Sequence, residues 1–354
     1  MFINKALLFL AAILAVMASF ACQPPANPYI DSGRAAFDSK QYDVAIAEYS
    51  KAIGMDSKSA AAYTGRGNAY LQQKKYDQSL ADFSKAVELD PQSPKALLGR
   101  GNTYYNNKNY GLAFADFSQA ISLDPTSGDA YLGRASCWHM MRNCPEAIAD
   151  YDRAEKLGNK DRRLFSNRGS CLWFASSYDK ALSDFNRAIE LDPTNADYYN
   201  NRATAYLSLG NLDLAEADVT RSLELNPNDC WTWSTRAEIS YAKGDINRSL
   251  EEINRSLDSG CSQYDIYCDR ARCYYDRKEY GKALNDLNKA LEMNSKYSPA
   301  YLYRGLCYEN FKQDDKALAD YQSAVNNSSD PAILKQAIDS IKRVSVTESC
   351  NCGK

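Results

Sequence analysis

The sequence has 354 residues, and its 42 Lys and Arg against 45 Asp and Glu give a formal net charge of −3. This balance argues against a dedicated nucleic-acid binder, which needs a basic surface, and against strong electrostatic attraction to an anionic membrane. A single His leaves little room for a His-based metal site or acid–base pair, and the sequence holds no phosphate-binding glycine loop and no nucleophile elbow. We therefore expect neither enzymatic activity nor a cofactor.

Residues 1–21 are typical of a secretory signal peptide. Lys5 supplies the positive charge, an uncharged apolar run follows, and the small residues Ser19 and Ala21 precede the cleavage site. The next residue is Cys22, and a signal that ends on Cys resembles that of a bacterial lipoprotein, in which this Cys carries the lipid. Ser19 stands where Leu is usual in lipoproteins, so the alternative is an ordinary secreted protein cut after Ala21, with Cys22 a free thiol.

Both alternatives predict an exported chain. Residues 22–28 are rich in Pro and would form a short, stiff tether. A lipid on Cys22 would hold the folded part at a membrane of the bacterial cell envelope, on its periplasmic or surface face. Gln23 after the Cys favours the outer membrane under the sorting rules of enteric bacteria.

Beyond the tether, a unit of 34 residues occurs nine times over residues 26–331 without insertion or deletion. Positions 8, 20 and 27 of the unit hold only Gly, Ala or Ser in all nine copies, and position 4 is large in every copy. Positions 4, 8 and 11 share one helix face, and positions 20, 24 and 27 share a face of a second helix. Small residues on both helices let the two backbones approach closely, so each copy predicts a pair of packed helices. The copies start at residues 26, 60, 94, 128, 162, 196, 230, 264 and 298.

Asp-Pro or Asn-Pro, such as Asp90-Pro91, closes the second helix in several copies, because Pro cannot continue a helix. This pattern resembles the tetratricopeptide repeat (TPR) family. The resemblance implies an all-α fold, a right-handed superhelical α-solenoid of nine helix–turn–helix repeats. We expect a C-terminal capping helix over residues 331–344 and a loose tail over 345–354. Other residues replace Pro at position 32 in five copies, which leaves the local geometry there open: Ser57, Asn159, Cys261, Ser295 and Ser329.

Position 7 is Arg in eight copies and position 23 is Asp or Glu in all nine. Both positions lie next to closely packed positions, so we expect Arg and acid to form bidentate ion pairs between neighbouring helices. An Arg stripe that binds a polyanion is the alternative. The Arg residues are Arg66, Arg100, Arg134, Arg168, Arg202, Arg236, Arg270 and Arg304.

Positions 5, 9 and 12 form a further stripe on each first helix, and in the family this stripe lines the concave groove together with positions 2 and 13. Aromatic side chains on such a wall are typical anchors for a bound peptide. The alternative is that they only pack against the neighbouring repeat. No Lys or Arg occurs at position 5, so the clamp of chaperone-docking members is absent. The candidate groove residues are Tyr105, His139, Met140, Trp173, Phe174, Trp231, Tyr241 and Tyr275.

Cysteine is frequent, with 11 copies in the chain. Cys230 and Cys261 flank the two ends of one repeat on the same edge of the stack, so we expect them to form a disulfide. Four other cysteines stand at position 10 of different repeats. We expect equivalent positions on stacked repeats to be too far apart for these cysteines to form disulfides with one another. Cys350 and Cys352 could form a redox pair or hold a metal.

We therefore expect a membrane-anchored, exported scaffold that binds another protein or peptide in the concave groove and has no nucleic-acid partner. Cell-envelope assembly or the organisation of a complex would be its setting. Two alternatives stay open: a thiol-redox protein that uses Cys350 and Cys352, and a carrier of a small hydrophobic ligand.

Overall fold

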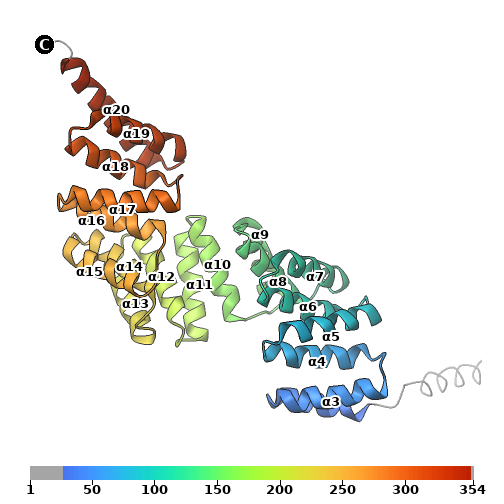
Figure 1. Cartoon of the computed structure of the whole chain (residues 1–354). Helices are drawn as coiled ribbons and strands as arrows, with labels where there is room; N and C mark the ends of the chain where they lie inside the picture. Colours follow the sequence, from blue (N-terminus) through green and yellow to red (C-terminus); the bar gives the residue numbers. More distant parts are fainter. Residues whose placement is uncertain (1–26, 352–354) are drawn as a thin grey trace, which may run out of the picture. The chain divides into compact units, whose positions relative to one another are not determined.

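The computed structural model describes residues 27–351 and contains 19 α-helices and no β-strand over that range (Figure 1). The predicted signal peptide, residues 1–21, and the predicted lipidation site, Cys22, lie outside the described residues. Pro28 is already the first residue of helix α2, so the predicted tether ends one residue earlier than expected. From the second copy on, every first helix begins at the residue predicted as the start of its copy.

The helices form two compact units that divide between Lys160 and Asp161. The first unit holds four repeats, each a first helix followed by a second helix. Its helices are α2 (Pro28–Asp38), α3 (Tyr42–Met55), α4 (Ala60–Gln72), α5 (Tyr76–Leu89), α6 (Pro94–Asn106), α7 (Tyr110–Leu123), α8 (Gly128–Met140) and α9 (Cys144–Lys156).

The second unit holds five repeats and a final helix. Its first four helices are α10 (Arg162–Phe174), α11 (Tyr178–Leu191), α12 (Ala196–Ser208) and α13 (Leu212–Leu225). They are followed by α14 (Cys230–Ala242), α15 (Ile246–Asp258), α16 (Tyr264–Asp276), α17 (Tyr280–Met293), α18 (Ser298–Asn310), α19 (Asp314–Asn327) and α20 (Pro331–Asn351).

The close approach predicted from the small residues is present in the repeats that have Gly at position 8. An added Cβ at Gly67 would lie 3.2 Å from the ring of Phe83, and one at Gly169 would lie 2.7 Å from the ring of Phe185. Phe83 is fully buried and Phe185 is nearly so. In these repeats the Gly at position 8 of the first helix therefore receives the aromatic ring at position 24 of the second helix, which forms the core of the repeat.

Arg–Asp pairs join the first and second helix of most repeats. In seven repeats the Arg at position 7 donates from Nε and Nη2 to the two oxygens of the Asp at position 23, at 2.7 or 2.8 Å. The bidentate pairing is thus confirmed there. It occupies the planar fork of each guanidinium, so these arginines do not offer that fork to a polyanion.

The prediction is wrong for the repeat of α14 and α15, where the acid is Glu252. The longer Glu252 side chain accepts from Ser240 Oγ at 2.5 Å and from Arg248 Nε at 2.9 Å. Arg236 keeps only an ionic contact of 3.0 Å between its Nε and Glu252 Oε1, and that Nε has no hydrogen-bond partner. One extra methylene therefore redirects the carboxylate to other donors.

Two second helices, α9 and α15, end differently from the others. They stop at Lys156 and Asp258 and are followed by Gly158 (φ 89°) and Gly260 (φ 104°), a left-handed conformation that Gly adopts without strain. Most other second helices end on an extended Asp or Asn, and Asp56 and Asn294 keep this geometry without a following Pro. Gly, rather than the loss of Pro, therefore changes the helix end.

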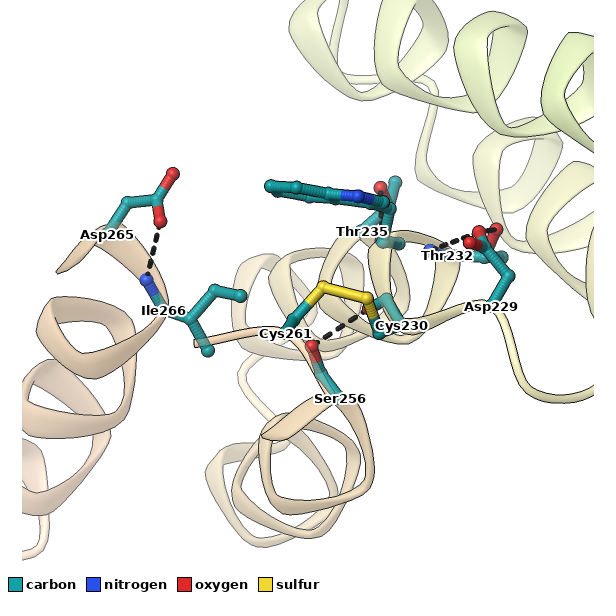
Figure 2. Close-up of a disulfide and its surroundings, with 9 residues drawn as sticks. Asp229, Cys230, Thr232, Thr235, Ser256, Cys261, Asp265 and Ile266 are labelled. Atoms are coloured by element: carbon teal, nitrogen blue, oxygen red, sulfur yellow. Dashed lines mark hydrogen bonds between the residues drawn. A yellow bond between two sulfur atoms is a disulfide. The ribbon is translucent and has the colours of Figure 1, made fainter. Parts of the chain in front are cut away.

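A disulfide joins Cys230, the first residue of α14, to Cys261, which follows α15 (Figure 2). This is the pairing expected from the sequence. Ser256 Oγ donates to the Cys230 carbonyl at 2.8 Å, and Ile266 of α16 packs in the same buried cluster as Cys261. The bond thus ties the two ends of one repeat beside the start of the next.

The last helix, α20, runs to Asn351, seven residues past the predicted end. The predicted loose tail over 345–354 is therefore wrong for residues 345–351. Residues 345–351 contain neither Gly nor Pro, so nothing in this stretch of sequence stops a helix. The Arg343 guanidinium pairs with Glu309 of α18 at 2.8 Å through two nitrogens, which fixes α20 on the end of the second unit.

Candidate functional site

The first helices of consecutive repeats line the inner side of each unit. In the first unit α2, α4, α6 and α8 contact one another in order, and in the second unit α10, α12, α14, α16 and α18 do the same. The second helices of consecutive repeats make no such contacts among the described residues. A stack in which only one row of helices touches curves toward that row, so the first helices form a concave inner face within each unit.

The inner face of the first unit contains a pocket of about 370 Å³. Its walls include Arg34, Phe37, Thr64, Asn68 and Lys95, which come from α2, α4 and α6. These residues occupy positions 2, 5, 9 and 12 of their repeats. The stripe that the family resemblance assigned to the groove therefore does line a hollow.

Three predicted groove residues lie farther along the first unit. Tyr105 on α6 is half-buried, and its ring packs 5.4 Å from that of Tyr110. His139 on α8 is half-buried, and burial lowers its pKa, so the imidazole is neutral at pH 7. Met140 is 44% exposed. Of the three, Met140 is the most available to a partner.

Three further predicted residues lie in the second unit. Phe174, at the end of α10, is 67% exposed and stands edge-on to Trp173, with ring centroids 5.0 Å apart. Trp173 is half-buried and donates from Nε1 to Ser208 Oγ at 2.9 Å. Trp231 on α14 is 47% exposed. Phe174 and Trp231 are thus large, water-exposed apolar side chains on first helices, and Trp173 supports Phe174.

The last two predicted residues mainly pack within the stack. Tyr241 on α14 donates from its hydroxyl to Asp276 Oδ2 at 2.6 Å. Tyr275 on α16 packs between Tyr280 and Tyr303, with centroid distances of 5.5 and 6.0 Å. Both side chains therefore contact the following repeat, Tyr241 through Asp276 and Tyr275 through Tyr303.

Sequence reasoning missed a group of charged and tyrosine side chains on the inner face of α14, α16 and α18. We call it the acidic–tyrosine cluster, and it consists of Glu238, Tyr241, Asp265, Asp269, Arg272, Asp276 and Tyr303. The signal was present in the sequence, because Glu238 and Arg272 stand at position 9, where five earlier copies have Asn, Ser or Thr.

The electrostatics of this cluster are unusual. Loss of hydration, together with the negative charges of Asp269 and Asp265, raises the pKa of Glu238 to about 7, although water still reaches this side chain. Loss of hydration also raises the pKa of Asp269 to about 6, against the opposing effect of Arg272. Protein atoms and neighbouring carboxylates therefore disfavour negative charge at both residues.

The buried thiols at position 10 are poor candidates for redox chemistry. Cys137, Cys273 and Cys307 are buried and form no disulfide, and Cys171 at the same position is also buried. Burial raises the pKa of Cys137 and of Cys307 to about 12, so their thiols stay protonated. Cys352 and the side chain of Cys350, on which the thiol-redox alternative rests, lie outside what the structure describes.

The described residues show neither a metal-binding group nor a membrane-spanning helix. No group of three or more His, Cys, Asp or Glu side chains among the described residues is arranged to hold a metal ion. Within residues 27–351, none of the helices is both long and apolar enough to cross a bilayer.

Comparison with protein-family models identifies the repeat. A TPR repeat model matches residues 33–74, 67–108 and 176–210, one tetratricopeptide repeat model matches 94–127 and 196–229, and another matches 268–331. The chain belongs to the tetratricopeptide repeat family, and its fold is an all-α repeat solenoid. This fold is consistent with a protein–protein interaction scaffold. A search of curated proteins found no match.

Solved structures with the same fold are distant in sequence. A chain of the APC/C hetero-tetramer Cut9–Hcn1 aligns with 85% of this chain at 16% identity and a TM-score of 0.62, and this chain spans 58% of its length. A tetratricopeptide repeat protein from Parabacteroides merdae ATCC 43184 aligns with 71% of this chain, over 99% of its own length, at 19% identity and a TM-score of 0.59. Yeast Tom70 aligns with 91% of this chain, over 96% of its own length, at 15% identity and a TM-score of 0.51. At these identities the likeness concerns the fold alone.

Proposed function

We propose that this protein is an interaction scaffold that binds a partner polypeptide along its inner face and catalyses no reaction. The observations that carry the proposal are a hollow on the inner face of the first unit and large exposed apolar side chains on the first helices of the second unit. The pocket in the first unit is open to a segment of chain, and Phe174 and Trp231 in the second unit are exposed aromatic side chains of the kind that serve as binding anchors.

We further propose that the protein is exported and held at the cell envelope by a lipid on Cys22. Support comes from the sequence of residues 1–22 alone, with its charged start, apolar run and terminal Cys. A role in cell-envelope assembly or in organising an envelope complex follows from that location. Mass spectrometry of the mature protein tests it, because a diacylglycerol on Cys22 adds a defined mass that cleavage alone would not.

The binding role is tested by pull-down from the envelope fraction of the source cells. The protein and a Phe174→Ala, Trp231→Ala variant serve as baits, and we expect the variant to lose most of the recovered partner. The matched control is Leu112→Ala, Leu214→Ala, which removes two apolar side chains that are 54% and 52% exposed on second helices. Equal recovery by the inner-face variant and the control would contradict binding at the inner face.

A further inference from the structure

The acidic–tyrosine cluster contains more negative charge than its own cation can balance. Four carboxylates, of Glu238, Asp265, Asp269 and Asp276, face one guanidinium, that of Arg272. This differs from the Arg–Asp pairs between the first and second helices, where each buried Asp has its own Arg. The inner face of α14, α16 and α18 therefore has an excess of negative charge.

The individual contacts show where this excess lies. Asp269 Oδ1 lies 3.3 Å from Arg272 Nη2, and Asp276 accepts only the neutral hydroxyl of Tyr241. Asp265 accepts the backbone N–H of Ile266. Among the described residues, Glu238 takes part in no hydrogen bond or ion pair. A cation arriving at Glu238 would thus displace no existing partner.

The contacts of the Arg272 side chain show how a guanidinium is held at this surface. Its guanidinium lies over the Tyr241 ring, 4.0 Å from the centroid, which is the shortest cation–ring distance found in the described chain. The same guanidinium contacts Asp269 on its edge. Tyr303 lies near enough to interact with it electrostatically. A tyrosine face with a carboxylate at the edge is a general arrangement for binding Lys and Arg side chains.

The charge at this site is unfavourable in the unliganded protein. Loss of hydration is the main cause that disfavours the charged form of Glu238, Asp269 and Asp265 of α16 add to it, and Arg272 of α16 opposes it. Glu238 could be Ser or Thr, as at position 9 of the three preceding repeats, with no loss of an internal contact. Charges that cost stability and make no internal bond are typical of binding sites.

We propose that the acidic–tyrosine cluster binds a Lys or Arg side chain of a polypeptide segment that lies along the inner face of α14, α16 and α18. The proposal rests on the function proposed above and specifies the chemistry of the partner. A metal ion is a poor fit, because these carboxylates do not converge on a single coordination site. An organic cation is a better fit, because an ammonium or guanidinium can pair with a single carboxylate such as that of Glu238, and Arg272 shows that this surface holds a guanidinium between a tyrosine face and a carboxylate.

Selection from a random-peptide phage library tests the proposal, with the full chain as bait. We expect the selected peptides to be enriched in Lys or Arg. A selected peptide should bind about tenfold more weakly when its Arg is replaced by citrulline, which keeps the shape and removes the charge. The Glu238→Gln and Asp269→Asn variants should each remove most of that difference, and Glu238→Gln breaks no contact of the fold.

The matched control is Glu190→Gln, Glu224→Gln, which removes two negative charges on second helices. These carboxylates pair with Arg187 and Arg221 and are largely exposed, so the control should bind like the unchanged protein. Selected peptides without Lys or Arg, or citrulline peptides that bind as well as Arg peptides, would overturn the cation proposal and leave inner-face binding intact. Failure to select any peptide would contradict the proposed function itself.

Discussion

The inner faces of the two units differ at one repeating position. In the first unit, position 6 is Gly65, Gly99 and Gly133, and an added Cβ would lie 2.1 to 2.6 Å from the aromatic ring at position 24 of the preceding repeat. In the second, third and fourth repeats of the second unit, position 24 is aliphatic instead, and position 6 of the repeat after each carries a side chain. The pairs there are Val219 with Thr235, Ile253 with Asp269, and Leu287 with Tyr303.

This difference teaches how a uniform repeat can acquire a local site. In the first unit, the ring at position 24 occupies the space beside position 6 of the next repeat, which is Gly there. An aliphatic residue at position 24 is smaller, and position 6 after it carries a side chain, as at Asp269. A ring does not by itself exclude a side chain at position 6, because Asn167 follows Tyr151 and Asn201 follows Phe185. The aliphatic core residues therefore accompany the acidic–tyrosine cluster, whose position 6 residues are larger than Gly.

The largest effect is expected where the two units are alike. Arg168 and Asp184 form the most buried of the bidentate pairs, and Arg100 with Asp116 is its counterpart in the first unit. Asp184→Asn and Asp116→Asn should each lower the free energy of unfolding by about 3 kcal/mol, because a largely buried guanidinium loses its partner. Urea unfolding followed by circular dichroism checks this. The surface variant Glu190→Gln should change it by less than about 0.5 kcal/mol. Losses as small as that for both Asp184→Asn and Asp116→Asn would show that the pairs contribute no stability.

Among the residues that the structure describes, the disulfide Cys230–Cys261 lies in the second unit. Repeat ends with Gly occur in both units, but Asn159 in the first unit bonds Asp129 Oδ1 at 2.8 Å where the second unit has Cys230–Cys261. Replacing both cysteines by Ser should destabilise the second unit by about 3 kcal/mol, since the bond closes a long loop. Amide hydrogen exchange would show the loss in α14 and α15 and none in α8 and α9. Equal changes in both units would contradict this local role.

The pairing of position 6 with position 24 can be broken and restored. Gly99→Asp should destabilise the first unit by about 2 to 3 kcal/mol, because the fully buried Phe83 ring occupies the space. Adding Phe83→Ile should recover part of this loss, since it recreates the combination of Ile253 with Asp269. Gly111→Ala is the control, with nothing within 4 Å of its Cβ. A double variant that is less stable than the sum of its single changes would contradict the rule.

The smallest effect is a pH dependence confined to the second unit. The pKa of Glu238 is raised from 4.5 to about 7, so the folded state keeps a proton that the unfolded state has lost, and stability falls as the pH rises through this window. Glu238→Gln should therefore match the unchanged protein near pH 4 and exceed it near pH 8. The gain is on the order of 1 kcal/mol, because water reaches the side chain. Thermal melts at both pH values check it, and a gain of the same size at both would contradict the charge argument.

The periodic features of the fold could be predicted from the sequence. Small residues at positions 8, 20 and 27 define the helix pairs, and Arg with Asp sixteen residues later defines the ion pairs, because seven of the nine copies repeat the same contact. The exception at Glu252 was not predictable, since its carboxylate is redirected by Ser240 and Arg248, which are particular to that repeat.

The candidate site was predicted only in part. The pattern indicated which helix face lines the inner side, and Met140, Phe174 and Trp231 are exposed there. It did not distinguish them from Tyr241 and Tyr275, whose burial depends on neighbours in the next repeat. The acidic–tyrosine cluster was not predicted, because it combines residues from three repeats. Its excess of negative charge can be recognised only when the contacts among these residues are known.

Hydrogen–deuterium exchange of the full chain, with and without a peptide selected by it, tests the central claim most directly. If a polypeptide binds along the inner face of the second unit, added peptide will slow exchange in the first helices α14, α16 and α18 and leave the second helices α15 and α17 unchanged. Slower exchange in α15 and α17 with no change in α14, α16 and α18 would place the peptide on the outer face and contradict the account.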